Sequence, residues 1–193
     1  MLAFDAATHT YRWGQQIIPS VTQILADLIP YPVSVAQWYL DRGRAVHACA
    51  ALLAQGKTFK HDPAIDGQVA ALNRFYREVR PEIIAVEQMH IHPARIYAGT
   101  CDLWTRIGTR LCIVDFKASS DIERTTLQMG GYSAFPRAPA HGVEVEVRDD
   151  GTYSMSPIIN LRGGPRASFL AMASVWHVRE RMGYHKTKGE MQQ

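Results

Sequence analysis

Two aspartates and a lysine lie in two strand-like runs of the segment AGTCDLWTRIGTRLCIVDFKAS, which spans positions 98–119. Asp102 stands in the first run, and Asp115 and Lys117 stand in the second. A charge in a buried strand is unfavourable unless a partner or a metal ion compensates it. The spacing therefore predicts that these three side chains form a chemical site.

The residues between the two runs fit a tight hairpin turn. Gly108-Thr109 suits a type II′ turn, which places glycine first, and this predicts that Ile107 pairs with Arg110. The same register sets the two aspartates directly opposite each other, with the lysine on their face. Facing carboxylates have Cβ atoms only about 5 Å apart and repel each other. A cation between them removes the repulsion, and oxygen ligands favour Mg²⁺ or Mn²⁺. The alternative is a solvated hairpin face on which opposed charges meet.

Polar residues elsewhere in the chain could complete such a site. Gln128 and Tyr132 are four residues apart and share one face of the next helix, where they could orient a phosphate or the attacking water. The alternative is an exposed glutamine beside a core tyrosine. His47 lies on a helical face of small residues that could bring its imidazole to a metal, or it is a structural histidine. Glu87 lies in the middle of a strand, and it could reach the same metal if that strand flanks the hairpin. Otherwise it is a charge on an edge strand.

This ordered set of residues resembles the PD-(D/E)XK nuclease superfamily. The resemblance includes the G-T-x-D motif at Asp102, Asp115-Phe116-Lys117 and Gln128-x-x-x-Tyr132, preceded by His47. It is strongest for the RecB-type branch, which includes phage and prophage exonucleases. The resemblance implies a restriction-endonuclease-like core and metal-dependent phosphodiester hydrolysis. The metal ligands that it implies are His47, Asp102, Asp115, the backbone carbonyl of Phe116 and, more loosely, Glu87. It also implies that Lys117 holds or activates the attacking water and that Gln128 and Tyr132 complete the catalytic site.

The cysteines depart from the iron–sulfur members of that superfamily. Cys49, Cys101 and Cys112 are widely spaced and form no C-x-x-C pair. We therefore expect three free, buried thiols and no iron–sulfur cluster. Cys101 also stands where the superfamily's name places proline.

The remaining elements form a frame around the site. We expect one domain over residues 1–193, with a helical part at about 19–80, a sheet core at about 82–161 and a closing helix at about 164–184. Residues 82–92, 95–107 and 109–119 read as three successive strands, and 143–147 and 152–160 read as a hairpin. A helix begins near Asp62-Pro63 and ends before Pro81. An earlier helix is predicted to begin near Ser34 and Gln37 and to end at Gly56, either as one helix or as two divided at Gly43. The predicted fold class is a small mixed sheet flanked by helices, α/β or α+β.

Composition sets limits on function and location. The chain has 193 residues, 47% hydrophobic residues and a formal net charge of +3. No apolar run approaches the ~18 residues that a membrane helix needs, and the N-terminus lacks the pattern of a secretion signal. We expect a cytoplasmic protein of a bacterium or a phage-infected cell, with no membrane partner.

The sequence predicts a Mg²⁺- or Mn²⁺-dependent DNA nuclease, most consistent with a phage-type exonuclease acting in recombination, repair or degradation of DNA. Its predicted partners are single-stranded or duplex DNA ends and a phage recombination or single-strand-binding protein. Candidate phosphate contacts are Arg42, Arg44, Arg74 and Arg77, each of which could instead belong to a solvated helix face. Tyr31, Trp38 and Tyr39 could stack on bases, although core packing is their default interpretation. The alternatives are an endonuclease of the same superfamily, an inactive nuclease fold that only binds DNA or protein, and a metal-dependent hydrolase with another substrate.

Overall fold

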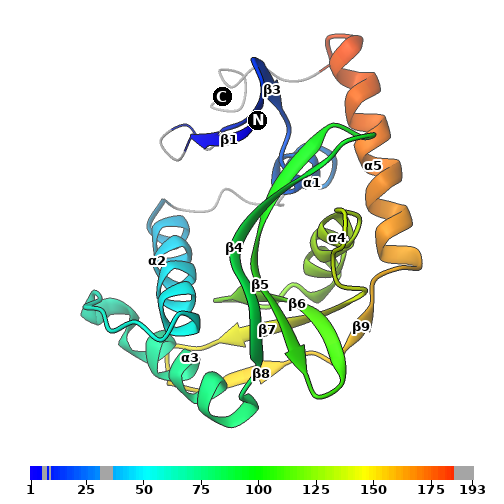
Figure 1. Cartoon of the computed structure of the whole chain (residues 1–193). Coiled ribbons are helices and arrows are strands. Elements are labelled where there is room, and N and C mark those ends of the chain that lie inside the picture. The colour runs from blue at the N-terminus through cyan, green and yellow to red at the C-terminus, as the bar shows by residue number, and fades with distance from the viewer. Residues whose placement is uncertain (6–7, 9, 31–36, 185–193) are drawn as a thin grey trace.

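The structure, a computed structural model, describes residues 1–5, 8, 10–30 and 37–184. Figure 1 shows a curved central sheet with helices on both sides. The helices are α1 (Val21–Leu28), α2 (Gln37–Ala54), the 3₁₀ turn η1 (Pro63–Ile65), α3 (Asp66–Val79), α4 (Ile122–Ser133) and α5 (Gly164–Arg181). The strands are β1 (Leu2–Asp5), β2 (Thr10–Trp13), β3 (Gln16–Ile18), β4 (Glu82–His92), β5 (Tyr97–Ile107), β6 (Arg110–Lys117), β7 (His141–Val147), β8 (Tyr153–Met155) and β9 (Ile159–Asn160).

The main sheet is mixed. Its strand order is β4-β5-β6-β7-β8, and β9 pairs with β7. All these pairs are antiparallel except β6–β7, which is parallel. A parallel pair needs a crossover connection, and α4 provides it. Strands β1, β2 and β3 form a separate antiparallel sheet. The mixed sheet with flanking helices confirms the predicted fold class.

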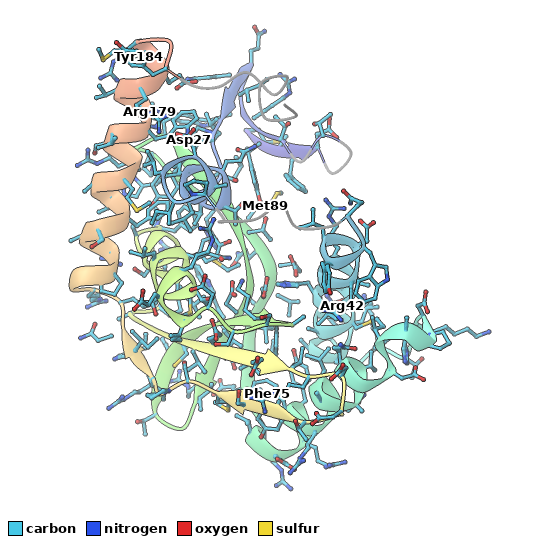
Figure 2. The ribbon with its side chains drawn as sticks, turned by 180° about the vertical axis from the view of Figure 1, so that it is seen from behind. Asp27, Arg42, Phe75, Met89, Arg179 and Tyr184 are labelled. Carbon is cyan, nitrogen blue, oxygen red and sulfur yellow. The ribbon has the colours of Figure 1, made fainter. Side chains whose placement is uncertain are left out.

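Two hydrophobic layers hold the helices on the sheet. On one face Val114 and Phe116 of β6 pack with Leu72 and Phe75 of α3 and with residues of α2. Figure 2 shows Phe75 in this layer. On the other face Ile113 packs with residues of α1, α4 and α5. The alternation along β6 arises because successive strand side chains point to opposite faces. The sheet is therefore covered on both sides.

Most predicted elements are present. Strands β4, β5 and β6 are the three successive strands, and β7 with β8 is the later hairpin. The Asp62 side chain caps η1, which leads directly into α3. All three cysteines are free and buried, as predicted. None of the helices formed by residues 10–30 and 37–184 is long and apolar enough to cross a membrane.

The structure decides one open alternative for the helical part and contradicts one prediction. Gly43 does not divide the helix, because α2 runs without a break for 18 residues. Trp38 and Tyr39 do not pack in a core, because they are 55% and 54% exposed. They lie at the start of α2, where their rings meet edge to face and the Arg42 guanidinium lies over both. Tyr31 and Ser34 lie outside the described residues.

Candidate metal centre

The hairpin of β5 and β6 sets the geometry of the site. Its register pairs Ile107 with Arg110 and continues to Leu103 with Val114, as predicted. Gly108 has a φ of 59°, the positive value that the first turn position of type II′ requires. The next positions beyond the last of these pairs are the two aspartates. Asp102 and Asp115 therefore lie on neighbouring strands, one position beyond the last of the β5–β6 pairs.

The Asp102 carboxylate is held by groups on two elements. Its Oδ2 lies 3.0 Å from Nδ1 of His47, which α2 supplies. The same oxygen accepts a hydrogen bond of 3.0 Å from the backbone N–H of Phe116 on β6. One aspartate thus connects α2, β5 and β6, and the helix brings the histidine to the sheet as the sequence predicted.

Glu87 reaches this group from the edge strand β4. His47, Glu87 and Asp102 each offer a ligand atom, and these three atoms lie within 4.8 Å of one another. Glu87 has a φ of 49°, in the left-handed region that a glutamate rarely adopts. The strand is also irregular between Ile83 and Ala85, where its register on β5 shifts. Strained backbone of this kind is concentrated at functional sites, where the surrounding structure holds it in place.

A second set of contacts surrounds Asp115, which is 1% exposed. The Lys117 ammonium contacts its carboxylate. The Gln128 side chain donates to Asp115 Oδ1 at 2.9 Å and lies 3.1 Å from the Tyr132 hydroxyl. The Lys117 ammonium also donates to Gln128 Oε1 at 3.3 Å. Helix α4 thus adds its glutamine and tyrosine to the charged pair on β6.

Gly99 allows the Tyr132 ring to approach β5. A Cβ atom built on Gly99 would lie 2.7 Å from Cε1 of that ring, closer than real Cβ contacts. With its ring packed against β5, Tyr132 places its hydroxyl within hydrogen-bond distance of Gln128. Gly99 belongs to the G-T-x-D motif, but no pattern in the sequence indicated that its missing side chain makes room for the tyrosine.

The clustered charges shift several pKa values. Burial alone would lower the pKa of His47, but the charge and hydrogen bond of Asp102 raise it to about 9. Burial would raise the pKa of Asp102, yet the His47 ring brings it below its ordinary value. Lost solvation, followed by the Asp102 charge, raises the pKa of Glu87 to about 7, although the residue as a whole is exposed. For Asp115 burial, helped by Asp102 and opposed by Lys117, raises the pKa.

These donors fit a divalent cation. One imidazole nitrogen and two carboxylates converge, and lost solvation, followed by the Asp102 charge, raises the pKa of Glu87. Carboxylates suit Mg²⁺ and Mn²⁺, and an imidazole is also accepted by Mn²⁺ and by softer ions. The donor set could hold a metal without selecting one ion. Asp115 is not a member of this close group, because its carboxylate faces Lys117 and Gln128.

The arginine candidates lie on helix surfaces. Arg44 is ion-paired with Asp41 at 2.7 Å, and Arg74 is ion-paired with Glu78 at 2.7 Å. Arg42, labelled on α2 in Figure 2, lies over the two exposed aromatic rings of that helix. Arg77 is an exposed residue in the last turn of α3. None of the contacts found in the described part of the chain brings these four to the His47–Asp102 group, so their role in DNA binding stays a prediction.

One acidic pair beside the site was missed. Glu144 of β7 is the parallel-strand partner of Asp115, and Glu146 is the partner of Lys117. The alternation in VEVEV shows that both glutamates share a face. Their position beside β6 could not be read from the sequence, because nothing in it states which strand β7 joins.

Comparisons with known proteins give a match in structure but none in sequence. No family model and no curated protein matches the chain. The crystal structure of the alkaline exonuclease LHK-Exo from Laribacter hongkongensis matches with a TM-score of 0.51 at 14% identity, covering 86% of this chain and 88% of that one. LHK-Exo in complex with dAMP gives 0.52 at 13% identity over 86% of this chain and 89% of that one. SSO0001 gives only 0.36 at 13% identity, over 80% and 81% of the two chains.

The likeness to LHK-Exo concerns the fold. It spans most of both chains, and at this identity it shows a shared architecture. The chain therefore has the fold seen in the alkaline exonuclease LHK-Exo, in agreement with the fold that the resemblance of its motif residues implied. The group of His47, Glu87 and Asp102 adds a possible metal site to that fold.

Proposed function

We propose that this chain is a divalent-metal-dependent deoxyribonuclease that hydrolyses phosphodiester bonds and acts as a phage-type exonuclease. One observation carries the proposal: two linked clusters meet at the end of the β5–β6 hairpin. One cluster contains His47, Asp102 and Glu87, and the other contains Asp115 with Lys117 and its α4 partners. The likeness to an exonuclease whose structure contains dAMP supports DNA as the substrate class.

The metal would be Mg²⁺ or Mn²⁺. His47, Glu87 and Asp102 would hold it, joined by Asp115 and the Phe116 carbonyl. When bound, such an ion lowers the pKa of a coordinated water and neutralises charge on a phosphate. Asp102 anchors this group, because it contacts both His47 and the β6 backbone.

The remaining residues act on the substrate and on water. Lys117 lies between Asp115 and Gln128, so its ammonium can orient the attacking water and stabilise negative charge on the phosphate. Gln128 holds Asp115 with its amide N–H group and fixes the position of the lysine with its oxygen. Tyr132 contacts the same amide, which sets the orientation of Gln128. These contacts hold the Lys117 ammonium in the position from which it would bind the phosphate.

The test is digestion of linear DNA labelled at either end, single-stranded and duplex, with Mg²⁺, Mn²⁺ or EDTA. Wild type is compared with Asp115→Ala and with Asp149→Asn, a matched control on the exposed β7–β8 turn. We expect metal-dependent shortening from one end by wild type and Asp149→Asn and none by Asp115→Ala. DNA binding without cleavage by folded wild type would contradict the proposal and favour the inactive binding module.

A further inference from the structure

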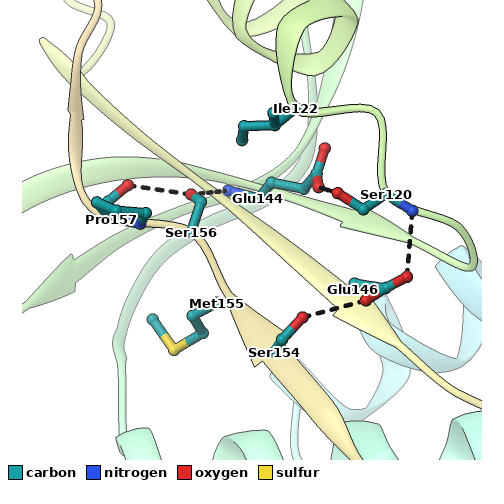
Figure 3. Close-up of a pocket in the computed structure, with 8 residues that line it drawn as sticks. All are labelled: Ser120, Ile122, Glu144, Glu146, Ser154, Met155, Ser156 and Pro157. Atoms are coloured by element: carbon teal, nitrogen blue, oxygen red, sulfur yellow. Dashed lines mark hydrogen bonds between the residues drawn. The ribbon is translucent and has the colours of Figure 1, made fainter.

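A polar cavity lies beside β7, on its side toward β8. It has a volume of about 220 Å³. Figure 3 shows that the loop before α4, strand β7 and the segment around β8 supply its walls. Its polar lining consists of two glutamates and three serines: Glu144, Glu146, Ser120, Ser154 and Ser156.

Glu144 is a buried acid with an uncompensated oxygen. The residue is only 3% exposed. Its Oε1 accepts a hydrogen bond from the Ser120 hydroxyl. Its Oε2 is buried and has no hydrogen-bond partner in the part of the chain that the structure describes. Buried acids in proteins are normally neutralised, paired with a positive group or bound to a metal, so an ionised Glu144 needs a further partner at Oε2.

Glu146 brings a second carboxylate to the same place. Its Oε1 accepts a hydrogen bond of 3.2 Å from the Ser120 backbone N–H, and its Oε2 accepts one of 3.1 Å from Ser154. Arg148 forms an ion pair with Glu146, and within residues 37–184 the two glutamates have no other ion pair. Both glutamates thus converge on Ser120, with one arginine to balance two acids.

This cavity is separate from the metal centre. Glu144 neighbours Asp115 in the β6–β7 pair, but the two side chains have different partners. Asp115 contacts Lys117 and Gln128, whereas Glu144 contacts Ser120. Glu144 is also absent from the close group of His47, Glu87 and Asp102.

We propose that this cavity binds a second divalent cation of the Mg²⁺ and Ca²⁺ class. The donors are carboxylate and hydroxyl oxygens, which such hard cations prefer. Glu144 and Glu146 supply the charge, and serine hydroxyls and water complete the coordination. The cation links β7 and β8 to the loop that connects Lys117 to α4. It is therefore a structural ion, and the inference does not rest on nuclease activity.

The test is thermal unfolding with and without Ca²⁺ in an Asp102→Asn background, which weakens the candidate metal centre. Glu144→Gln removes the buried charge, and Glu123→Gln makes the same change on the exposed first turn of α4. We expect saturating Ca²⁺ to raise Tm by about 5 °C or more in the parent and in Glu123→Gln. Glu144→Gln should lose this shift and, without Ca²⁺, be at least as stable as the parent.

Equilibrium dialysis with Ca²⁺ then counts the sites. We expect one bound ion in the Asp102→Asn parent and none after Glu144→Gln is added, with Glu146→Gln weakening the same site. A Ca²⁺ shift that survives in Glu144→Gln would overturn the inference. A parent protein whose Tm does not change with Ca²⁺ would also overturn the inference, because Glu144 would then be buried without binding a cation. Failure of the nuclease proposal would leave these results unchanged.

Discussion

The proton on His47 makes metal binding depend strongly on pH. The Asp102 carboxylate raises the pKa of His47 to about 9, so the metal-free site keeps a proton on the ring at neutral pH. A metal needs the neutral imidazole and must displace that proton. With a pKa of about 9, only about 1% of His47 is neutral at pH 7 and about half at pH 9, so the apparent affinity should rise about 50-fold over that range.

Isothermal titration with Mg²⁺ in buffers of different ionisation enthalpy measures both the affinity and the number of protons released. We expect close to one proton per ion at pH 8. A second proton should be released below pH 7, where Glu87 also becomes protonated. His47→Gln should remove most of the pH dependence between pH 7 and pH 9. An affinity for wild type that changes less than about 3-fold over that range would refute the reasoning.

Three further predictions concern stability and local geometry. In metal-free protein the raised pKa of His47 stabilises the fold fully below pH 6.5, and this contribution of at most about 3 kcal/mol is lost as pH rises through about 9. Urea unfolding at pH 6 and pH 10 measures this loss, with His47→Gln as the control. An equal loss of unfolding free energy in both proteins would contradict the prediction. Gly99→Ala places a Cβ 2.7 Å from the Tyr132 ring, so we expect the free energy of unfolding to fall by about 1–3 kcal/mol and nuclease activity to be lower. Gly43→Ala is the matched control, because nothing lies within 4 Å of a Cβ at that position, and it should be neutral or stabilising. Glu87→Gly relieves a left-handed φ of 49° and should raise the free energy of unfolding by up to about 1 kcal/mol while weakening Mg²⁺ binding; unchanged Mg²⁺ affinity would remove Glu87 from the metal centre.

The hairpin could be predicted because its determinants are local. Gly108 at the turn sets the pairing of Ile107 with Arg110, and period-two alternation then sets the face of every later residue. The helix after Asp62-Pro63 was likewise marked by a local cap. Such signals depend only on neighbouring residues, so the positions of the two aspartates followed from the sequence.

The contacts at those positions could not be predicted. The β5–β6 register places the two carboxylates on neighbouring strands. The side-chain rotamers then determine that Asp102 contacts His47 and that Asp115 contacts Lys117. The left-handed Glu87 likewise depends on the irregular pairing of β4, which its sequence pattern does not reveal.

Two features of α2 depend on how the helix packs and could not be read from residue preferences alone. Glycine in a helix costs only about 1 kcal/mol relative to alanine, and packing of Val46, Cys49 and Ala50 on the core offsets it at Gly43. Trp38 and Tyr39 read as core residues because large aromatic side chains are usually buried. They lie instead at the beginning of the helix, before the stretch that packs on the sheet.

The central claim is tested most directly by giving wild-type protein linear and closed circular DNA side by side, in Mg²⁺ and in EDTA. We expect the protein to degrade the linear DNA to mononucleotides in Mg²⁺ and to leave the circle intact. EDTA should stop the reaction. Cutting of the circle would keep the chemistry but make the protein an endonuclease. Intact linear DNA in Mg²⁺ and in Mn²⁺, with a folded protein, would contradict the account.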